Sequence, residues 1–595
     1  MKHNATKSEA RISWISGPVL RATTLDTFHI NEAIYVGPQK LLGEVIRIDR
    51  NTIVAQVYED TSSLRPGDRV MGYGNQLSVK LGPAILGGIF DGLLRPLKAE
   101  SGDYVMPGMR SSAAKVFSFT PRVKQGDFVD PGAIIGDITQ QHGRMQSAII
   151  PPDISGTVSK IFEKGDYADD IPVCVIETSD GVAHEIAMSH YWPIRQARPV
   201  HERLPTWGPL LTGQRILDCI FPLACGGRAA MPGGFGTGKT VLQETLAKWC
   251  DADIIVYVGC GERGNEMAGV LHELPGLEDP RTGRPLMERS VIIANTSNMP
   301  VAAREASIYT AVTVAEYFRD QGLRVALMAD STSRWAEALR EVSGRLGEIP
   351  SEAGYPAYLS SRLAEFYERA AHVRALCKKV GSLSIIGAVS PPSADFSEPV
   401  TTHTKRYVQV FWALDATRAQ ARFFPAIHPL QSYSGDIDDL IAFWKEHDHP
   451  RWLEQRRRFL TLLEEQTRLE RMARIVGKDA LPPRQQHILL CAELINDAFL
   501  RQSAFSEIDR YCSPARQATM MQLLSRFIRL SEKAIEQGVD IERINNLPLL
   551  RKLRRMSEDI SEEQLEIYDE LREEQEEAFA ALINEAASKE LMDVR

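Results

Sequence analysis

The residues best suited to chemistry form one glycine-rich string, Gly233-Gly234-Phe235-Gly236-Thr237-Gly238-Lys239-Thr240. It fits the pattern G-x-x-x-x-G-K-T, in which glycines let the backbone turn its N–H groups toward phosphate oxygens. A helix expected from Val241 would add the partial positive charge of its N-terminus. Lys239 could reach the β- and γ-phosphates of a nucleotide, and the Thr240 hydroxyl could bind Mg²⁺. The string therefore predicts a P-loop that binds ATP or ADP.

A P-loop needs an acid beside the metal ion, at the end of an apolar strand. The run Val325–Ala329 is such a strand, and Asp330 follows it. Asp330 could instead cap the next helix, as Ser331 equally could. Together with the P-loop, the arrangement favours Asp330 as a Mg²⁺ ligand that acts through a water molecule.

Hydrolysis also needs a group that positions and polarises water. Glu262 follows the expected strand Ile254–Val258, at the edge where ligands bind in open α/β sheets, and Arg263 comes next. Spacing alone leaves two alternatives for Glu262, a catalytic base or an ordinary exposed loop residue. The string 259–264 also matches G-x-G-x-x-G, but no second strand end is evident about twenty residues later, which argues against a dinucleotide site.

A second near match concerns zinc. His184-Glu185 and His190 resemble a metalloprotease helix, but the place four residues after His184 holds Met188. We expect a surface hairpin there instead.

The texture of the sequence changes along the chain and predicts several domains. Val45–Ile48 and Ile53–Val57 flank a polar turn, as in a β-hairpin. Apolar runs at 254–258, 290–294, 325–329 and 383–386 alternate with helical patterns, which is typical of a parallel α/β sheet. The predicted order is an N-terminal β-barrel over 1–75, the start of the nucleotide-binding region over 76–110, a β-rich insertion over 111–181, a P-loop α/β domain over 182–435, and a C-terminal α-helical domain over 436–595.

Composition narrows the functional classes. The net charge of −9 disfavours a protein that binds nucleic acid or anionic lipid. The eight cysteines include no C-x-x-C pair, so a zinc ribbon or disulfide scaffold is not expected. The N-terminus lacks an apolar signal-peptide core, and the sequence has no run of 18 apolar residues, so we expect a chain that does not itself cross a membrane.

Longer motifs carry a resemblance to a known family. The segments Gly261–Glu266, Asp330–Glu341, Gly347–Pro356 and Asp395–Thr401 resemble the catalytic A subunit of V-type and archaeal-type rotary ATPases. The likeness runs from the N-terminal barrel through Leu550. The block 111–181 resembles the insertion that marks these catalytic chains, built as a barrel-sandwich module. The fold that the resemblance implies is multidomain, with a RecA-like P-loop α/β domain between the barrel and the helical domain.

The resemblance also implies roles for particular residues. Glu262 matches the residue that activates water, and Arg263 the neighbour that contacts phosphate or orients it. Lys239, Thr240 and Asp330 match the phosphate and Mg²⁺ ligands. Phe424 and Phe505 match the aromatic pair that holds adenine, with Gln502 beside them; from the sequence alone, these aromatics would be assigned to a hydrophobic core.

Partners follow from the same resemblance. It implies a hexamer in which this chain alternates with a non-catalytic B subunit, which supplies an arginine finger in trans. Central and peripheral stalk subunits and a membrane sector that moves protons or sodium ions complete the expected complex, at the cytoplasmic face of a prokaryotic membrane and without nucleic acid. Which ion moves, and in which direction the reaction runs, lie beyond this sequence.

The sequence departs from the family at three places. Thr237 stands where the P-loop often has cysteine, Ser390–Asp395 has Ser393-Ala394 in place of two glycines, and His428-Pro429 replaces Asn-Trp. The alternatives to this function are a RecA-like motor of another class, such as a secretion ATPase or a nucleic-acid translocase, and a nucleotide-binding subunit without catalysis. A secretion ATPase is expected to lack the insertion, and a non-catalytic subunit to lack Lys239 or Glu262.

Overall fold

A computed structural model describes residues 7–97, 115–139 and 145–593. Parts of the predicted 76–110 region, the start of the insertion at 111 and both chain ends therefore lie outside the described residues. The chain divides into two compact units, each described separately below. The first contains 1–205, 225–232 and 252–408, and the second contains 206–224, 233–251 and 409–595.

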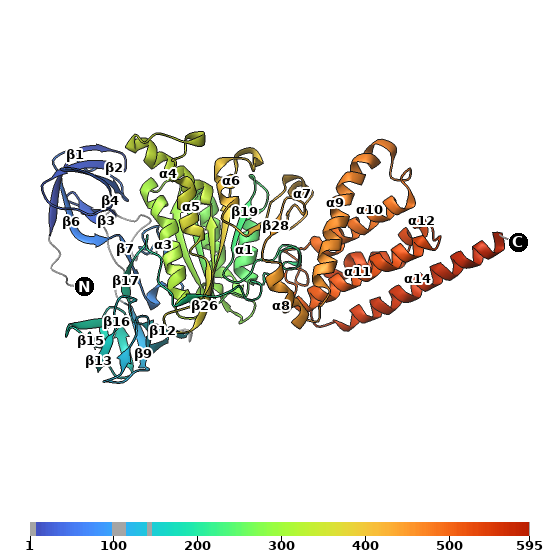
Figure 1. The fold of residues 1–595 in the computed structure, drawn as a ribbon, viewed down its shortest axis with the longest axis horizontal. Coiled ribbons are helices and arrows are strands. Elements are labelled where there is room, and N and C mark those ends of the chain that lie inside the picture. The colour runs from blue at the N-terminus through green and yellow to red at the C-terminus, as the bar shows by residue number, and fades with distance from the viewer. Residues whose placement is uncertain (1–6, 98–114, 140–144, 594–595) are drawn as a thin grey trace. The chain divides into compact units, whose positions relative to one another are not determined.

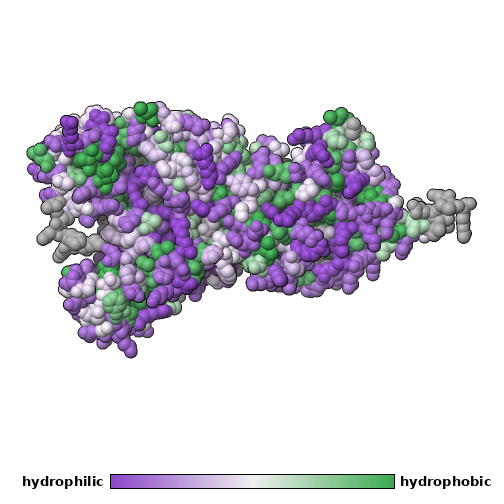
Figure 2. Space-filling model, viewed as in Figure 1, coloured by the Kyte–Doolittle hydropathy of each residue, from purple (hydrophilic) through white to green (hydrophobic). Residues whose placement is uncertain are grey.

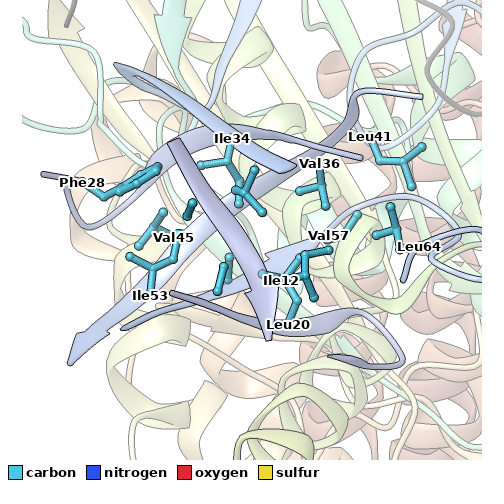
Figure 3. Close-up of a cluster of buried hydrophobic side chains, with 14 residues drawn as sticks. Ile12, Leu20, Phe28, Ile34, Val36, Leu41, Val45, Ile53, Val57 and Leu64 are labelled. Carbon is cyan, nitrogen blue, oxygen red and sulfur yellow. The ribbon is translucent and has the colours of Figure 1, made fainter. Parts of the chain in front are cut away.

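The first unit begins with a closed β-barrel, in the order β1-β2-β5-β4-β3-β6 (Figure 1). Its strands are β1 (Ser8–Ser16), β2 (Val19–Thr24), β3 (Glu32–Val36), β4 (Leu41–Asp49), β5 (Thr52–Val57) and β6 (Arg69–Gln76). Alternate side chains point inward, and Leu20, Ile34 and Val45 are among those fully buried in the core (Figure 3). The predicted hairpin is confirmed, with Asp49 paired to Thr52 across its turn.

A sandwich of two four-stranded sheets follows the barrel in sequence. One sheet has the order β10-β13-β15-β16 and the other β12-β11-β9-β14. The strands are β9 (Val116–Pro121), β10 (Phe128–Val129), β11 (Ile134–Thr139), β12 (Met145–Ile149), β13 (Gly156–Ile161), β14 (Gly165–Ala168), β15 (Pro172–Glu177) and β16 (Ala183–Ala187). Phe119, Ile138 and Ile176 lie fully buried in its own hydrophobic core. The β-rich insertion thus forms a barrel-sandwich module, whose last strand ends beyond residue 181.

The predicted hairpin around His184 and His190 is wrong. β16 pairs with β15 in the sandwich, whereas β17 (His190–Pro193) pairs with β7 (Ser78–Leu81). The Met188-Ser189 step between the two strands is buried, so it links two sheets rather than forming an exposed turn.

The rest of the first unit is a parallel sheet in the order β19-β26-β24-β20-β23-β8. Its strands are β8 (Ile89–Phe90), β19 (Arg228–Pro232), β20 (Ile254–Glu262), β23 (Ser290–Thr296), β24 (Arg324–Asp330) and β26 (Val380–Val389). The four predicted apolar runs are confirmed as strands. All but the last residue of β20 is buried, as expected for a strand covered on both faces.

Helices and short strands surround this sheet. α3 and α4 pack against β20 (Figure 1). The helices are α2 (Gly264–Glu273), α3 (Val301–Arg319), α4 (Thr332–Leu346), α5 (Leu359–Tyr367) and α6 (Pro399–Lys405), and the short strands are β18 (Glu202–Arg203), β21 (Glu278–Asp279), β22 (Arg284–Pro285) and β25 (Ala371–Arg374).

The second unit contains the P-loop helix and the C-terminal helices. Pro483 opens α10, and Ser513 caps α11 by accepting the N–H of Arg516. The elements are α1 (Lys239–Trp249), β27 (Val410–Phe411), α7 (Ala416–Gln420), β28 (Tyr433–Ser434), α8 (Ile441–Glu446), α9 (Trp452–Val476), α10 (Pro483–Ile495), α11 (Pro514–Glu536), α12 (Ile541–Asn545), α13 (Pro548–Asp559) and α14 (Glu566–Asp593). α10 packs on α9, and α14 packs on α11.

The surface is mostly hydrophilic on the face that Figure 2 shows, with hydrophobic residues scattered over it. Within 7–97, 115–139 and 145–593, the helices are too short or too polar to span a membrane.

A buried ion network joins the barrel to the α/β sheet domain. Arg195 binds Glu44 of β4 and Glu305 of α3, each through two nitrogens at 2.8–3.0 Å. Burial alone would raise the pKa of Glu305, but the charge of Arg195 outweighs it and lowers that pKa. The network replaces water as the partner of two carboxylates that the fold removes from solvent.

We predict that Arg195→Ala lowers the free energy of unfolding by about 3–5 kcal/mol, because it leaves two buried carboxylates without their partner. Arg47→Ala is the matched control, since its pair with Asp49 is about 60% exposed and should change stability by about 0.5 kcal/mol or less. Urea unfolding of the full chain measures both. Equal losses in the two variants would contradict the assignment.

Candidate functional site

The P-loop is a tight turn between β19 and α1. Gly236 and Gly238 have φ values of 74° and 81°, in the left-handed region that glycine adopts without strain. The buried Thr237 hydroxyl donates to the Gly234 carbonyl at 2.8 Å and fixes the middle of the loop. The Phe235 side chain at the tip is 88% exposed. The loop therefore holds its shape through its own residues.

α1 begins at Lys239, two residues earlier than the Val241 that the sequence suggested. The first amides of an α-helix have no acceptor inside the helix, and no side chain caps this end. Lys239 and Thr240 are half-buried in this first turn, and Val241 is exposed. The arrangement offers N–H groups, a cation and a hydroxyl to an anion at one helix N-terminus.

The predicted aromatic pair comes from two segments of the same unit. The Gln502 N–H donates to the Phe424 carbonyl at 2.7 Å and so brings these segments together. Phe424 is half-buried, whereas Phe505 is 94% exposed. An aromatic so exposed presents its ring to solvent and leaves it free to stack on a planar ligand. The Gln502 side chain is instead only 1% exposed.

The acidic residues end two neighbouring parallel strands of the first unit. Asp330 is the last residue of β24, and Glu262 is the last residue of β20 rather than part of a following loop. Gly259 of β20 lies opposite Asp330, so β20 extends three residues farther. Both carboxylates therefore lie at the carboxyl edge of the sheet, where open α/β folds bind ligands.

The surroundings of Glu262 shift its proton affinity. Burial, followed by the negative charge of Asp330, raises the pKa of Glu262 to about 7, and Glu266 adds to the effect. A carboxyl with such a pKa can exchange a proton near neutral pH. Arg263, the next residue, is exposed at the start of α2.

Asp330 does not serve as the cap of α4. The N-cap position belongs to Ser331, whose side chain makes no capping hydrogen bond. Asp330 is 5% exposed, and its Oδ2 accepts a hydrogen bond from the Tyr257 hydroxyl at 3.3 Å. A nearly buried carboxylate at a strand end agrees better with the metal-ligand interpretation than with capping.

Two arginines beside Glu262 had no predicted role. A Cβ on Gly261 would lie 2.7 Å from Arg304 Cδ and 2.9 Å from Arg334 Cβ, so both side chains pack against the residue before Glu262. Glu337 chiefly, and then Glu262, raise the pKa of Arg334 against the effect of burial. Arg334 lies within the motif 330–341, but only the fold brings it to the end of β20.

The chain matches four domain families of one kind. Residues 12–74 match the ATP synthase alpha/beta family, beta-barrel domain, and 110–195 match the ATP synthase alpha/beta subunit barrel-sandwich domain. Residues 213–434 match the ATP synthase alpha/beta family, nucleotide-binding domain, and 442–545 the C-terminal domain of V and A type ATP synthase.

Relatives match over almost the whole chain. The catalytic-type A chain of the A-type ATP synthase of Methanopyrus kandleri is 49% identical, covering 98% of this chain and 100% of its own length. The V-type ATP synthase alpha chain of Halothermothrix orenii is 47% identical, over 96% of this chain and 98% of its own.

A solved structure shares the fold. The assembled ATPase EscN of the enteropathogenic E. coli type III secretion system has a TM-score of 0.62 at 23% identity, covering 87% of this chain and 100% of EscN. That likeness concerns the fold alone, whereas the sequence relatives decide the family. The chain belongs to the ATP synthase alpha/beta family, in the class of the catalytic A subunits of A-type and V-type ATP synthases.

Proposed function

We propose that this catalytic ATP synthase chain forms and cleaves the terminal phosphoanhydride bond of ATP with Glu262 as the group that polarises the water. The observation that carries the proposal is a half-buried carboxyl of raised pKa, at the carboxyl end of a parallel strand beside Asp330. Arg263 contacts phosphate or orients Glu262. Gly233–Val241 bind the phosphates through backbone N–H groups, with Lys239 as their cation.

The donor groups suit Mg²⁺. In the part of the chain that the structure describes, no three His, Cys, Asp or Glu side chains gather into a metal-binding group. This agrees with nucleotide-dependent Mg²⁺, which takes one or two protein oxygens and completes its shell with waters and phosphates. Thr240 would bind through its hydroxyl and Asp330 through water. The bound ion would neutralise charge that develops on the phosphates.

The base of the nucleotide would bind between Phe424 and Phe505. Stacking on aromatic faces suits a purine, and the two segments already meet through the Gln502 N–H. His428 and Pro429 follow Phe424 closely. Burial lowers the pKa of His428, and its Nδ1 accepts the Leu430 N–H, so this imidazole is neutral at physiological pH.

The relatives' names place such chains in an ATP synthase, and hence in a complex of several subunits. We extend this to an alternating hexamer with a B subunit that supplies an arginine finger, to stalk subunits, and to a membrane sector that moves protons or sodium ions. The complex would lie at the cytoplasmic face of a prokaryotic membrane. We also propose domain boundaries near residues 75, 110, 181 and 435.

The P-loop shape should be essential for nucleotide binding. A Cβ on Gly233 would lie 2.5 Å from Thr237 Oγ1 and 2.8 Å from Leu414 Cβ. Gly233→Ala must therefore displace the loop, and we expect ATP affinity to fall by about tenfold or more, equivalent to ~1.4 kcal/mol. Gly269→Ala in α2 is the control, because its Cβ would meet nothing within 4 Å. Calorimetric titration of the full chain with Mg-ATP measures both, and undiminished binding by Gly233→Ala would refute the role of this turn.

The carboxylate of Glu262 should carry the chemical step. Glu262→Gln keeps the shape and most of the hydrogen bonding but removes the charge, so we expect the hydrolysis rate of the assembled complex to fall by about 10²-fold or more. Nucleotide binding should persist. Glu454→Gln, an exposed residue of α9, is the matched control. An unchanged rate in Glu262→Gln would mean that hydrolysis occurs elsewhere and that this chain binds nucleotide without catalysis.

Assembly should raise activity if an arginine acts in trans. We expect weak hydrolysis by the isolated chain and a rate higher by roughly 10³-fold or more once the partner chain is added, the range that such arginines contribute. Steady-state ATP hydrolysis before and after reconstitution tests this. An isolated chain as fast as the complex would exclude the arginine in trans.

A further inference from the structure

One buried arginine holds both ends of the segment that carries Phe505. The Arg215 side chain is fully buried, and each of its three guanidinium nitrogens binds the segment 499–509. Nε donates to the Phe499 carbonyl at 2.7 Å, and Nη2 to the Arg501 carbonyl at 2.6 Å. Nη1 pairs with Asp509 Oδ1 at 2.5 Å. A single side chain thus fixes where this segment begins and where it ends.

The Asp509 carboxylate continues this contact into the middle of the segment. Its second oxygen accepts the Ser503 N–H at 2.7 Å. Ser503 lies two residues before Phe505, so the carboxylate bridges the Arg215 guanidinium to the backbone that leads into the aromatic residue. Asp509 is 2% exposed, and the bridge is therefore shielded from water.

Gln502 attaches the same segment to its surroundings from the other side. Its Oε1 accepts the Arg215 N–H at 2.9 Å, and its Nε2 donates to the Gly213 carbonyl at 2.8 Å. Its own N–H donates to the Phe424 carbonyl at 2.7 Å. Both ends of the amide are occupied by backbone partners, so Gln502 orients the two aromatic segments rather than reaching a ligand itself.

The far end of the segment is attached to the helix that follows the P-loop. The Cys512 N–H donates to the Gly213 carbonyl at 3.0 Å. Tyr511 stacks on Trp249, the last residue of α1, with ring centroids 5.2 Å apart and planes at 26°. A Cβ on Gly213 would lie 2.2 Å from the Tyr511 ring, so the close approach requires glycine.

The exposure of Phe505 explains why these anchors matter. A side chain that is 94% exposed has almost no packing of its own to fix its position. The location of its ring is therefore set by the backbone on either side, and Arg215, through Asp509 and Gln502, sets that backbone. Fixing the loop before the ligand arrives removes an ordering cost from binding.

We propose that Arg215 is a positioning residue for the nucleotide base, which determines how much of the binding free energy comes from the base. The proposal rests on the proposed function, in which Phe424 and Phe505 receive adenine. Arginine is required because its planar fork reaches two carbonyls and a carboxylate in fixed directions at once. Lysine presents a single ammonium on a flexible chain and cannot replace all three contacts.

The test compares a ligand with a base to one without it. The full chain carrying Arg215→Lys is titrated calorimetrically with Mg-ATP and with Mg-tripolyphosphate, which keeps the phosphates and lacks the nucleoside. We expect the Kd for ATP to rise at least tenfold and the Kd for tripolyphosphate to change less than twofold. In the assembled complex, KM for ATP should rise more than kcat falls.

Two further variants keep the test decisive. Asp509→Asn removes the charge but keeps the shape, and we expect the same direction of change with a smaller size; it decides the matter if Arg215→Lys does not fold. Arg198→Lys is the matched control, because Arg198 is also buried and pairs with Asp320 at 2.6 Å, in the other compact unit. It should leave the ratio of the two Kd values unchanged.

Equal weakening of ATP and tripolyphosphate by Arg215→Lys would overturn the proposal and indicate general damage to the fold. Unchanged binding of both ligands would also overturn it. If the unaltered chain bound ATP no more tightly than tripolyphosphate, the adenine site itself would be wrong, and the proposal would fail with it. Failure of Arg215 alone is thus distinguishable from failure of the site.

Discussion

The site depends on one constraint, the burial of parallel strands on both faces. β20 and β24 have no exposed face on which a charged side chain could meet water, so polar chemistry is confined to the strand ends. Glu262 and Asp330 occupy two such ends on neighbouring strands. β19 ends in the same direction, and the P-loop begins at the next residue of the chain. The requirement to bury apolar strands therefore also determines where catalytic groups can lie.

The same burial gives Glu262 its chemical character. Removal from water disfavours the charged form, and the neighbouring Asp330 adds repulsion, so both effects raise the pKa of Glu262. Buried charges elsewhere in this unit show the opposite outcome. Glu305 is just as removed from water, but Arg195 meets it with two hydrogen bonds and lowers its pKa. The difference between a structural and a reactive carboxyl is whether a cation directly faces it.

Much of this architecture could be predicted because its signals are local. The P-loop string, the apolar runs of the central sheet and the β4–β5 hairpin each lie within a few residues, and the structure confirms them. The roles of Glu262, Asp330 and the aromatic pair, as well as the domain boundaries, stay predictions. The contacts of Arg195 and Arg215 could not be predicted, since Arg215 and Asp509 are 294 positions apart. The hairpin at His184 failed for the same reason, because β17 pairs with a strand more than a hundred residues earlier.

The departures from the family sequence show how backbone shape outlasts residue identity. Ser393 and Ala394 stand where the family has two glycines, yet they keep φ values of 55° and 57°. That region costs an ordinary residue about 1 kcal/mol or more relative to glycine. The neighbouring Asp395 accepts the backbone N–H and the hydroxyl of Ser397, which holds the turn at its end. The chain thus retains a left-handed turn at a cost in stability, which is the expected result when the fold around a segment dictates its conformation.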